Sequence, residues 1–156
     1  MKSKSPLLVV FLLCFWVFST QAQEKYPRQS LPLAKYNENV NTPLTAKEKE
    51  MLLDVYGDKL QEYVLSKPQR LKDIKNILRN RVEIIEIPDA KNHKECELLS
   101  SISLFNNYNP SLKRDFNFNT KTFNPLKYNF KFYGAEGALY KVDNTNYFIS
   151  IKPQYQ

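Results

Sequence analysis

The stretch that decides the fold is Ser103–Pro153, SLFNNYNPSLKRDFNFNTKTFNPLKYNFKFYGAEGALYKVDNTNYFISIKP. It holds an imperfect repeat, whose first copy is Tyr108–Phe118 and whose second copy is Phe123–Phe132. Each copy begins with an aromatic-Asn-Pro turn and continues through Leu and Lys to aromatic residues that alternate with polar ones. A residue before Pro avoids the helical region and Pro fixes φ, so no helix continues through either turn. Because alternation with a period of two is typical of a strand with one apolar face, the repeat predicts two β-strands.

The aromatic side of these strands has two interpretations, the core side of an antiparallel sheet or a binding platform at the surface. Strands normally bury aromatic residues, so we expect a core role for Phe116, Phe118, Phe130 and Phe132. Tyrosines at turns or near the end of the chain carry a hydroxyl group that can face water. The candidates for an exposed aromatic surface are therefore Tyr108, Tyr133 and Tyr155.

Two amphipathic helices are predicted before this stretch. The first begins at the capping box Thr45–Glu48 and ends near Ser66. Its middle is weakened by Gly57, by about 1 kcal/mol relative to Ala, so we expect a kink or an early break there. The second begins at Pro68, a residue suited to the first turn of a helix. The β-rich run Val82–Ile87 then predicts a strand.

Further strands are expected on both sides of the repeat. Leu98–Phe105 is a weaker strand candidate, while Ala138–Val142 and Tyr147–Lys152 form a predicted β-hairpin around the four-residue loop Asp143–Asn146. The whole pattern predicts an α+β domain. Its two N-terminal helices pack on one face of a mostly antiparallel sheet of four to six strands.

The N-terminus has the features of a secretory signal peptide. Lys2 and Lys4 precede the apolar run Leu7–Phe18, and the small residue Ala22 stands at a plausible cleavage point. The run is shorter than the about 20 residues that span a bilayer. We therefore expect residues 1–22 to be removed on export to the periplasm or the cell exterior. Retention as an N-terminal anchor is the alternative.

The mature chain is expected to divide into an extended or partly disordered arm, residues 23–43, and a single domain, residues 44–156. Loss of the two N-terminal lysines lowers the formal net charge of +7 by two. Cys96 is the one cysteine left, which excludes an internal disulfide. The mature sequence has no other apolar run long enough to cross a membrane, so we expect no transmembrane span.

The second predicted helix carries a basic stripe apart from its apolar side. Two interpretations stay open: an anion site for phosphate, an acidic glycan or a lipid headgroup, and an ordinary solvated face, which is the default for an amphipathic helix. We do not expect nucleic acid as a partner, because an exported protein would rarely meet it. The residues of the stripe are Arg70, Lys72, Lys75, Arg79 and Arg81.

Few residues point to chemistry. His93 and Cys96 supply two possible metal ligands where a structural zinc site needs four, and sequence neighbours rarely have catalytic geometry. The mature sequence has no glycine-rich phosphate loop, no His-Glu-x-x-His pattern and no nucleophile elbow. We therefore predict no cofactor, no metal and no catalytic residue. Scattered acidic residues leave a paired-carboxylate hydrolase open.

Three short segments carry a resemblance to other proteins: Thr20–Gln23 at the processing point, Pro68–Lys72 at a helix start, and Phe123–Tyr128 in the repeat. With these segments the chain resembles small exported proteins of bacteroidete-type bacteria whose activity is unknown. The resemblance covers most of the mature chain. It implies a location in the cell envelope and no mechanism.

These observations favour a non-catalytic envelope protein that binds a partner or assists assembly. The alternatives are a small envelope hydrolase that uses carboxylates and an anion-binding protein that uses the basic stripe. The partner would be another envelope protein, an anionic glycan or a lipid headgroup.

Overall fold

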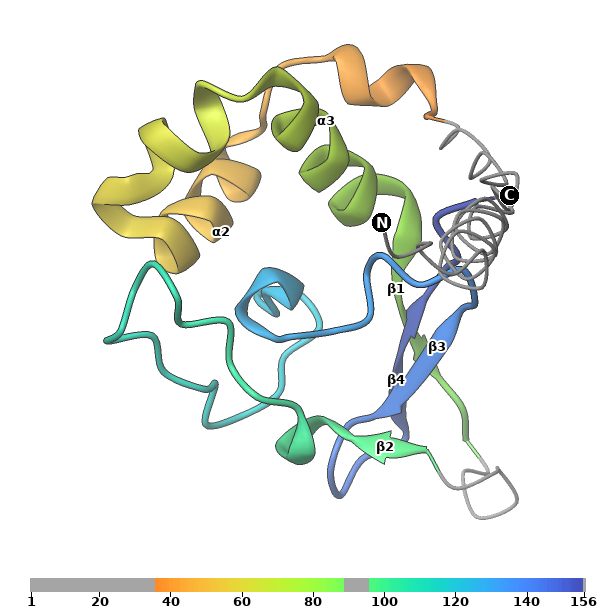
Figure 1. The fold of residues 1–156 in the computed structure, drawn as a ribbon. Coiled ribbons are helices and arrows are strands. Elements are labelled where there is room, and N and C mark those ends of the chain that lie inside the picture. The colour runs from red at the N-terminus through yellow and green to blue at the C-terminus, as the bar shows by residue number, and fades with distance from the viewer. Residues whose placement is uncertain (1–35, 89–95, 156) are drawn as a thin grey trace, which may run out of the picture. The chain divides into compact units, whose positions relative to one another are not determined.

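The computed structural model describes residues 36–88 and 96–155 (Figure 1). The predicted signal peptide, the arm before Tyr36 and His93 lie outside these residues. Short 3₁₀ or π segments, labelled η, separate the longer elements. In chain order the elements are η2 (Glu38–Asn41), α2 (Ala46–Tyr56), η3 (Gly57–Lys59), η4 (Gln61–Leu65), α3 (Pro68–Asn76), η5 (Ile77–Arg81), β1 (Val82–Glu86), β2 (Glu97–Leu98), η7 (Leu99–Ser101), η8 (Pro125–Lys127), β3 (Ala138–Lys141) and β4 (Tyr147–Ile151).

Helix α2 begins at the predicted capping box. The Thr45 hydroxyl accepts from the Glu48 amide at 3.2 Å, and the Glu48 carboxylate accepts from the Thr45 amide at 2.8 Å. The helix ends at Tyr56 because Gly57 adopts a φ of +52°, which side chains disfavour. The expected break at Gly57 is thus confirmed.

Helix α3 has Pro68 in its first turn, as the sequence predicted. It continues through the π segment η5 and leads directly into β1. Ile74 and Ile77 turn its apolar side into the core, where each is at most 3% exposed.

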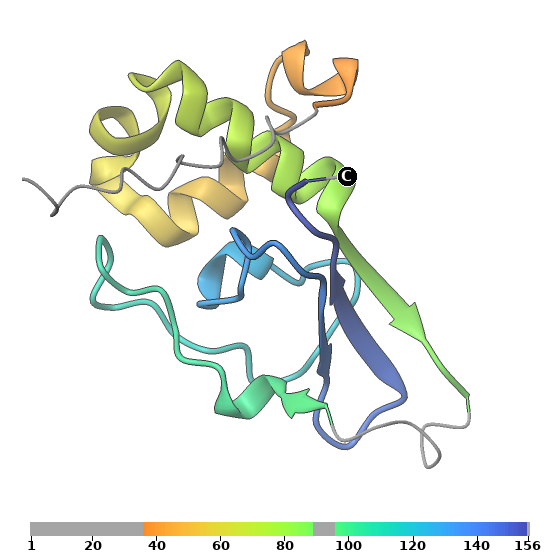
Figure 2. The same cartoon turned by 45° about the vertical axis from the view of Figure 1, so that its right-hand side comes forward.

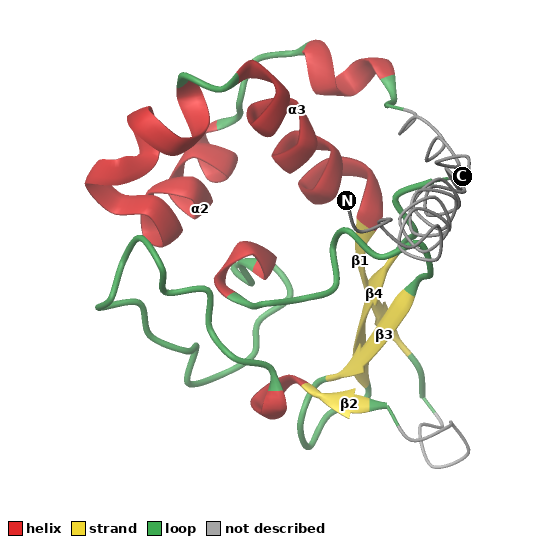
Figure 3. Cartoon of the chain, in the orientation of Figure 1, coloured by secondary structure: helices red, strands yellow, loops and turns green. Residues whose placement is uncertain are grey.

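The four strands form one sheet in the order β1-β4-β3-β2 (Figure 3). The β1–β4 and β3–β4 pairs are antiparallel, and β2 pairs with β3 in parallel over two residues. The predicted α+β fold and the C-terminal hairpin are confirmed, with a sheet that is mixed. The strand expected over Leu98–Phe105 is wrong beyond Leu98, because the chain turns there into η7. An isolated bridge outside the sheet pairs Leu104 with Tyr128 of the second copy.

The strands predicted for the two repeat copies are also wrong. In the second copy the Phe130 amide donates to the Tyr128 carbonyl, and the Phe132 amide donates to the Phe130 carbonyl, both at 2.8 Å. These bonds close consecutive γ-turns in place of a ladder between strands. Alternate side chains still face one side, so Phe130 and Phe132 are buried as expected, at 6% and 9% exposure. Both views show η8 and this segment between the helices and the sheet (Figures 1 and 2).

The first copy departs further from the prediction. Phe116, expected in the core, is 99% exposed. The Arg114 guanidinium before it donates to the carbonyls of Leu99 and Ile102, and the Asp115 carboxylate pairs with Lys127 at 2.6 Å. These hydrogen bonds and this ion pair leave Phe116 on the solvent side of the segment.

Phe118 meets the core prediction in part. It is half-buried, with its ring centroid 5.2 Å from that of Phe123 and 5.7 Å from that of Tyr147. One hydrophobic cluster joins the helices, the second copy and the inner face of the sheet. The irregular aromatic segment therefore mediates the packing of the helices on the sheet.

Candidate functional site

Three hollows among the described residues are candidates for a ligand site. We name them the lysine groove, the aromatic pocket and the amide pocket. Their volumes are about 370, 260 and 300 Å³ respectively. Ligand pockets are mostly apolar concavities with a few convergent polar groups, which gives the criterion for choosing among them.

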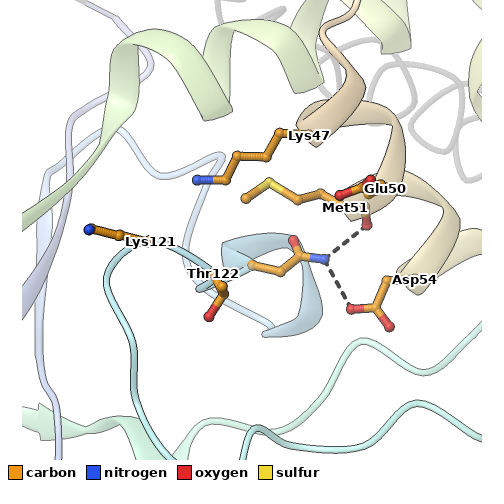
Figure 4. A pocket seen from close by; sticks show the side chains of 7 residues that line it. Lys47, Glu50, Met51, Asp54, Lys121 and Thr122 are labelled. Carbon is orange, nitrogen blue, oxygen red and sulfur yellow. Dashed lines mark hydrogen bonds between the residues drawn. The ribbon is translucent and has the colours of Figure 1, made fainter.

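The lysine groove lies between α2 and the turn that leads into η8 (Figure 4). Its amide group, that of Asn124, is already engaged: Nδ2 donates to the Met51 carbonyl at 2.9 Å and to Asp54 at 3.3 Å, and Oδ1 accepts from the Leu126 amide. The amino groups of Lys47 and Lys121 extend away from Asp54. Exposed charges of both signs are well solvated and screened, so this groove offers little specific recognition. Its lining residues are Lys47, Glu50, Met51, Asp54, Lys121, Thr122 and Asn124.

The aromatic pocket meets the criterion best. It lies between the two helices and the second repeat copy. Most of its lining residues are buried. Arg70 and Phe105 are half-buried, Asn129 is exposed and Tyr133 is 62% exposed, so these four mark its solvent side. The pocket is lined by Tyr56, Arg70, Ile74, Ile77, Phe105, Leu126, Tyr128, Asn129, Phe130, Phe132 and Tyr133.

One wall of the aromatic pocket belongs to a cluster of four rings, Tyr56, Tyr63, Phe105 and Tyr108. Tyr56 packs edge-on against Phe105, with ring centroids 6.1 Å apart, and is tilted against Tyr108 at 5.1 Å. Tyr63 reaches Tyr108 at 4.5 Å. Such ring pairs are rigid and stabilise one another beyond the area that they bury.

The opposite wall comes from the second repeat copy. Tyr128 and Phe130 stack with ring centroids 5.5 Å apart, and Phe130 meets Phe132 edge-on at 5.8 Å. Tyr140 of β3 supports Phe130 at 4.7 Å. The wall is therefore held in place by the sheet behind it.

Arg70 supplies the charge of the aromatic pocket. Its guanidinium lies over the rings of Tyr56 and Tyr108, 5.6 and 5.7 Å from their centroids, and donates to the Tyr56 hydroxyl at 3.4 Å. Within residues 36–88 and 96–155, no carboxylate lies within 4.0 Å of it. The aromatic faces thus orient a positive charge that they do not neutralise.

The predicted basic stripe does not stay together. Arg70 lines the aromatic pocket, while the Lys72 amino group lies 4.8 Å from the ring centroid of Tyr36. Arg81 is buried, and its guanidinium donates to the carbonyls of Lys152 and Phe132. Anion binding by the residues of the basic stripe stays a prediction.

Lys75 and Arg79 of the stripe hold the last residues of the arm on α3. The buried Lys75 amino group donates to the carbonyls of Val40 at 3.2 Å and Thr42 at 2.7 Å. Arg79 donates to both carboxylate oxygens of Glu48, at 2.5 and 2.6 Å. These hydrogen bonds hold the pKa of Glu48 below its ordinary value. Two of the predicted anion-binding groups therefore have partners inside the domain.

The predicted aromatic surface is divided in the same way. Tyr133 is exposed, as expected, and lines the aromatic pocket. Tyr108 is half-buried in the ring cluster, and Tyr155 is half-buried near the end of the chain. Arg70, Tyr108 and Tyr133 come from two separately predicted sets, and the fold brings them to one place.

Sequence reasoning missed Tyr56, Phe105 and Phe132 as parts of a site. Each fits the pattern of an ordinary core residue, and pattern alone does not show that three core positions border a hollow. The signals present in the sequence were a basic stripe on a helix and tyrosines at turns, and each was predicted separately. Only the long-range fold shows that these residues meet.

Metal binding and membrane spanning find no support in the part of the chain that is described. No group of three or more His, Cys, Asp or Glu side chains there could hold a metal ion. Cys96 is half-buried. No described helix is long and apolar enough to cross a membrane.

Comparison of the chain with protein-family models, curated proteins and solved structures finds no match.

Proposed function

We propose that this chain is an exported, non-catalytic binding domain whose aromatic pocket holds a small ligand with one apolar ring and one anionic group. The signal-peptide features of residues 1–22 support export to the periplasm or the cell exterior. One observation supports the ligand class above the others. The unneutralised Arg70 guanidinium lies on the faces of Tyr56 and Tyr108, beside a hollow with aromatic walls.

The ring of the ligand follows from the walls. Their aromatic and aliphatic side chains favour an apolar, planar body that stacks or packs edge-on. The volume of about 260 Å³ is near the lower end of ligand pockets, which favours a ligand with a single ring.

The anionic group follows from Arg70. A guanidinium recognises a carboxylate or phosphate with parallel hydrogen bonds, and burial beside aromatic rings strengthens them. A hydrogen bond to a charged group contributes about 1.5–3 kcal/mol. Removing the guanidinium should therefore weaken binding roughly 10- to 100-fold.

The lining of the aromatic pocket supports binding over hydrolysis. None of its described residues is Asp, Glu, His, Cys or Ser, the usual acids, bases and nucleophiles. The hydrolase alternative would need carboxylates elsewhere, and Glu50 and Asp54 line the open lysine groove.

Isothermal titration calorimetry tests the proposal with three ring-bearing anions as probes: phenylacetate, benzoate and benzyl phosphate. At least one should bind more tightly than phenylacetamide, which lacks the charge, and than acetate, which lacks the ring. The Arg70→Gln variant should lose this preference for the charged probe. Lys67→Gln removes an exposed charge just before the same helix and should bind like the wild type.

Two results would contradict the proposal. One is that no ring-bearing anion binds better than phenylacetamide. The other is that Arg70→Gln, shown to be folded by its thermal unfolding curve, binds the charged probe as tightly as the wild type does.

A further inference from the structure

The amide pocket is separate from the aromatic pocket and has a different chemistry. It lies where the first described residues, the α3–η5 helix and the segment after β4 meet, and its volume is about 300 Å³. Its side chains are rich in hydrogen-bond donors. They belong to Asn37, Asn76, Asn80, Arg81, Lys152, Pro153 and Gln154.

Arg81 is the buried charge of this pocket, at 6% exposure. Its Nε and Nη2 donate to the Lys152 carbonyl at 3.2 and 2.9 Å, and Nη2 also donates to the Phe132 carbonyl. Nη1 makes no hydrogen bond to a described residue, and no described carboxylate lies within 4.0 Å of the guanidinium.

The groups that lie closest to the Arg81 charge and offset it are therefore backbone carbonyl dipoles. The negative charge of the Asp73 carboxylate acts on it from farther away. Burial lowers the pKa of the guanidinium, which reflects how unfavourable its removal from water is. A buried cation compensated in this way is stabilised by an anion that reaches it.

Asn76 supplies a second donor, from a residue that is 5% exposed. Its Oδ1 accepts from Asn80 Nδ2 at 2.8 Å, and Asn80 Oδ1 accepts from Asn39 at 2.7 Å and from Asn37 at 3.3 Å. In this arrangement Asn76 Oδ1 is the acceptor, and Nδ2 is left as the donor. Asn76 Nδ2 makes no hydrogen bond to any of residues 36–88 or 96–155, and no buried side-chain nitrogen or oxygen among these residues lacks a partner, so Nδ2 is open to solvent and free to donate to a ligand.

We propose that the amide pocket is a second binding site, which takes an oxyanion group, a carboxylate or a phosphate, through Arg81 and Asn76 Nδ2. The Lys152 amino group at its border adds positive charge and is paired with Glu83 at the surface. The amides supply donors that fix orientation, and the guanidinium supplies the attraction. This site is independent of the ligand proposed for the aromatic pocket.

Side-chain NMR tests this site directly, with inorganic phosphate and acetate as the two probes at constant ionic strength. Saturable shifts of the Asn76 amide and Arg81 Nε signals are expected with at least one probe. Saturation with phosphate alone, acetate alone or both identifies the oxyanion that the site accepts, and each of these results supports the proposal.

The Gln154→Glu variant is the sharpest mutation for this site. Gln154 is half-buried and makes no side-chain hydrogen bond to a described residue, so a Glu there places a carboxylate inside the pocket without removing a contact. We expect roughly a tenfold or greater loss of probe affinity and a higher melting temperature. Gln61→Glu, the same charge change at an exposed site, should bind the probe as the wild type does.

Two outcomes would overturn the proposal. One is that neither phosphate nor acetate gives a saturable shift at Asn76 and Arg81. The other is that the probe binds Gln154→Glu as tightly as it binds the wild type. If Gln154→Glu does not fold, Asn37→Asp places the negative charge at an exposed lining residue instead, with the same expected loss. Arg70→Gln should leave the shift unchanged, which separates this site from the aromatic pocket.

Discussion

The two copies of the repeat begin alike and end in opposite environments. Both form the same local turn, in which the side-chain Oδ1 of an Asn accepts from the backbone amide two residues later: Asn109 from Ser111 at 3.2 Å, and Asn124 from Leu126 at 3.1 Å. Both Asn side chains also donate to carbonyls near the end of α2, Asn109 to Asp54 at 2.8 Å and Asn124 to Met51 at 2.9 Å.

The copies diverge after the Lys that follows each turn. The second copy continues at once into alternating aromatics, and Phe130 is 6% exposed. In the first copy Arg114 and Asp115 intervene, and Phe116 is 99% exposed. Aromatic residues that alternate with polar ones are therefore buried only where no charged residues at the start of the segment hold it at the surface.

The largest effect that tests this comparison is expected for Phe130→Ala. Its ring packs against Tyr128, Phe132 and Tyr140, so its removal should lower the free energy of unfolding by about 3–5 kcal/mol. Urea unfolding followed by circular dichroism measures the loss. Tyr133→Ala, the exposed neighbour, is the control. A stable Phe130→Ala protein beside a collapsed Tyr133→Ala protein would show that the faces are assigned the wrong way round.

The fold was largely predictable from the sequence, for reasons that differ between elements. The capping box at Thr45, Pro68 in the first turn of α3 and the C-terminal hairpin are local signals, and local hydrogen bonds realise them. The aromatic segment failed because an alternating pattern fixes which side chains share a side and not which groups accept the backbone hydrogen bonds. Tyr128–Phe132 alternates as a strand does, but the Phe130 and Phe132 amides bond within the segment.

The candidate site was predictable only in pieces. Arg70 and Tyr133 were singled out from the sequence for different reasons, and no local pattern indicates that they line one pocket. Conversely, Lys75 and Arg79 looked solvated because helical spacing shows the face of a helix and not what covers it. In the fold, Glu48 and the last residues of the arm cover that face.

A second test concerns the charge that ties the first copy to the second. The Lys127 side chain is 8% exposed and pairs with Asp115 at 2.6 Å, while Asp54 is farther away at 3.8 Å. Asp115→Asn leaves this buried cation poorly compensated and should lower stability by about 2 kcal/mol. Asp58→Asn, an exposed change in η3, is the matched control. Equal unfolding curves for the two variants would show that the ion pair between Asp115 and Lys127 does not stabilise the fold.

The paired turns allow a finer comparison. Asn124 is 4% exposed, and Asn124→Ala leaves the Leu126 amide without a partner and removes the bond to the Met51 carbonyl, so we expect a loss of about 1–2 kcal/mol. Asn109 is half-buried and its partners can bond water, so Asn109→Ala should cost less than about 1 kcal/mol. Chemical unfolding of both variants ranks them. The reverse order would mean that the first turn, and not the second, anchors the segment.

A smaller effect depends on pH. Burial, with the nearby charge of Asp115, raises the pKa of Tyr128 above its ordinary value of 10.0. The folded state therefore keeps this proton longer than the unfolded state does. The contribution to stability is full below about pH 10 and is lost as the pH rises through the raised pKa. Tyr128→Phe lacks this group, so the stability of the wild type relative to the variant should fall above about pH 10. A difference that is constant with pH would argue against a buried hydroxyl.

The smallest effect is expected for the exposed aromatic of the first copy. Phe116→Ala removes a ring that is 99% exposed, so stability should change by less than about 0.5 kcal/mol. Thermal unfolding measures it. A loss comparable to that of Phe130→Ala would place Phe116 in the core after all and end the contrast between the copies.

Intermolecular nuclear Overhauser effects show directly where a bound probe lies on the protein. Phenylacetate, or whichever ring-bearing anion binds best, is added to the labelled protein. We predict contacts from the ring of the probe to Phe130, Phe132 and Tyr133 of the aromatic pocket, and their loss in Arg70→Gln. Contacts to Phe116 and Phe118 instead, or contacts that persist unchanged in Arg70→Gln, would contradict the assignment of the binding site to the second copy.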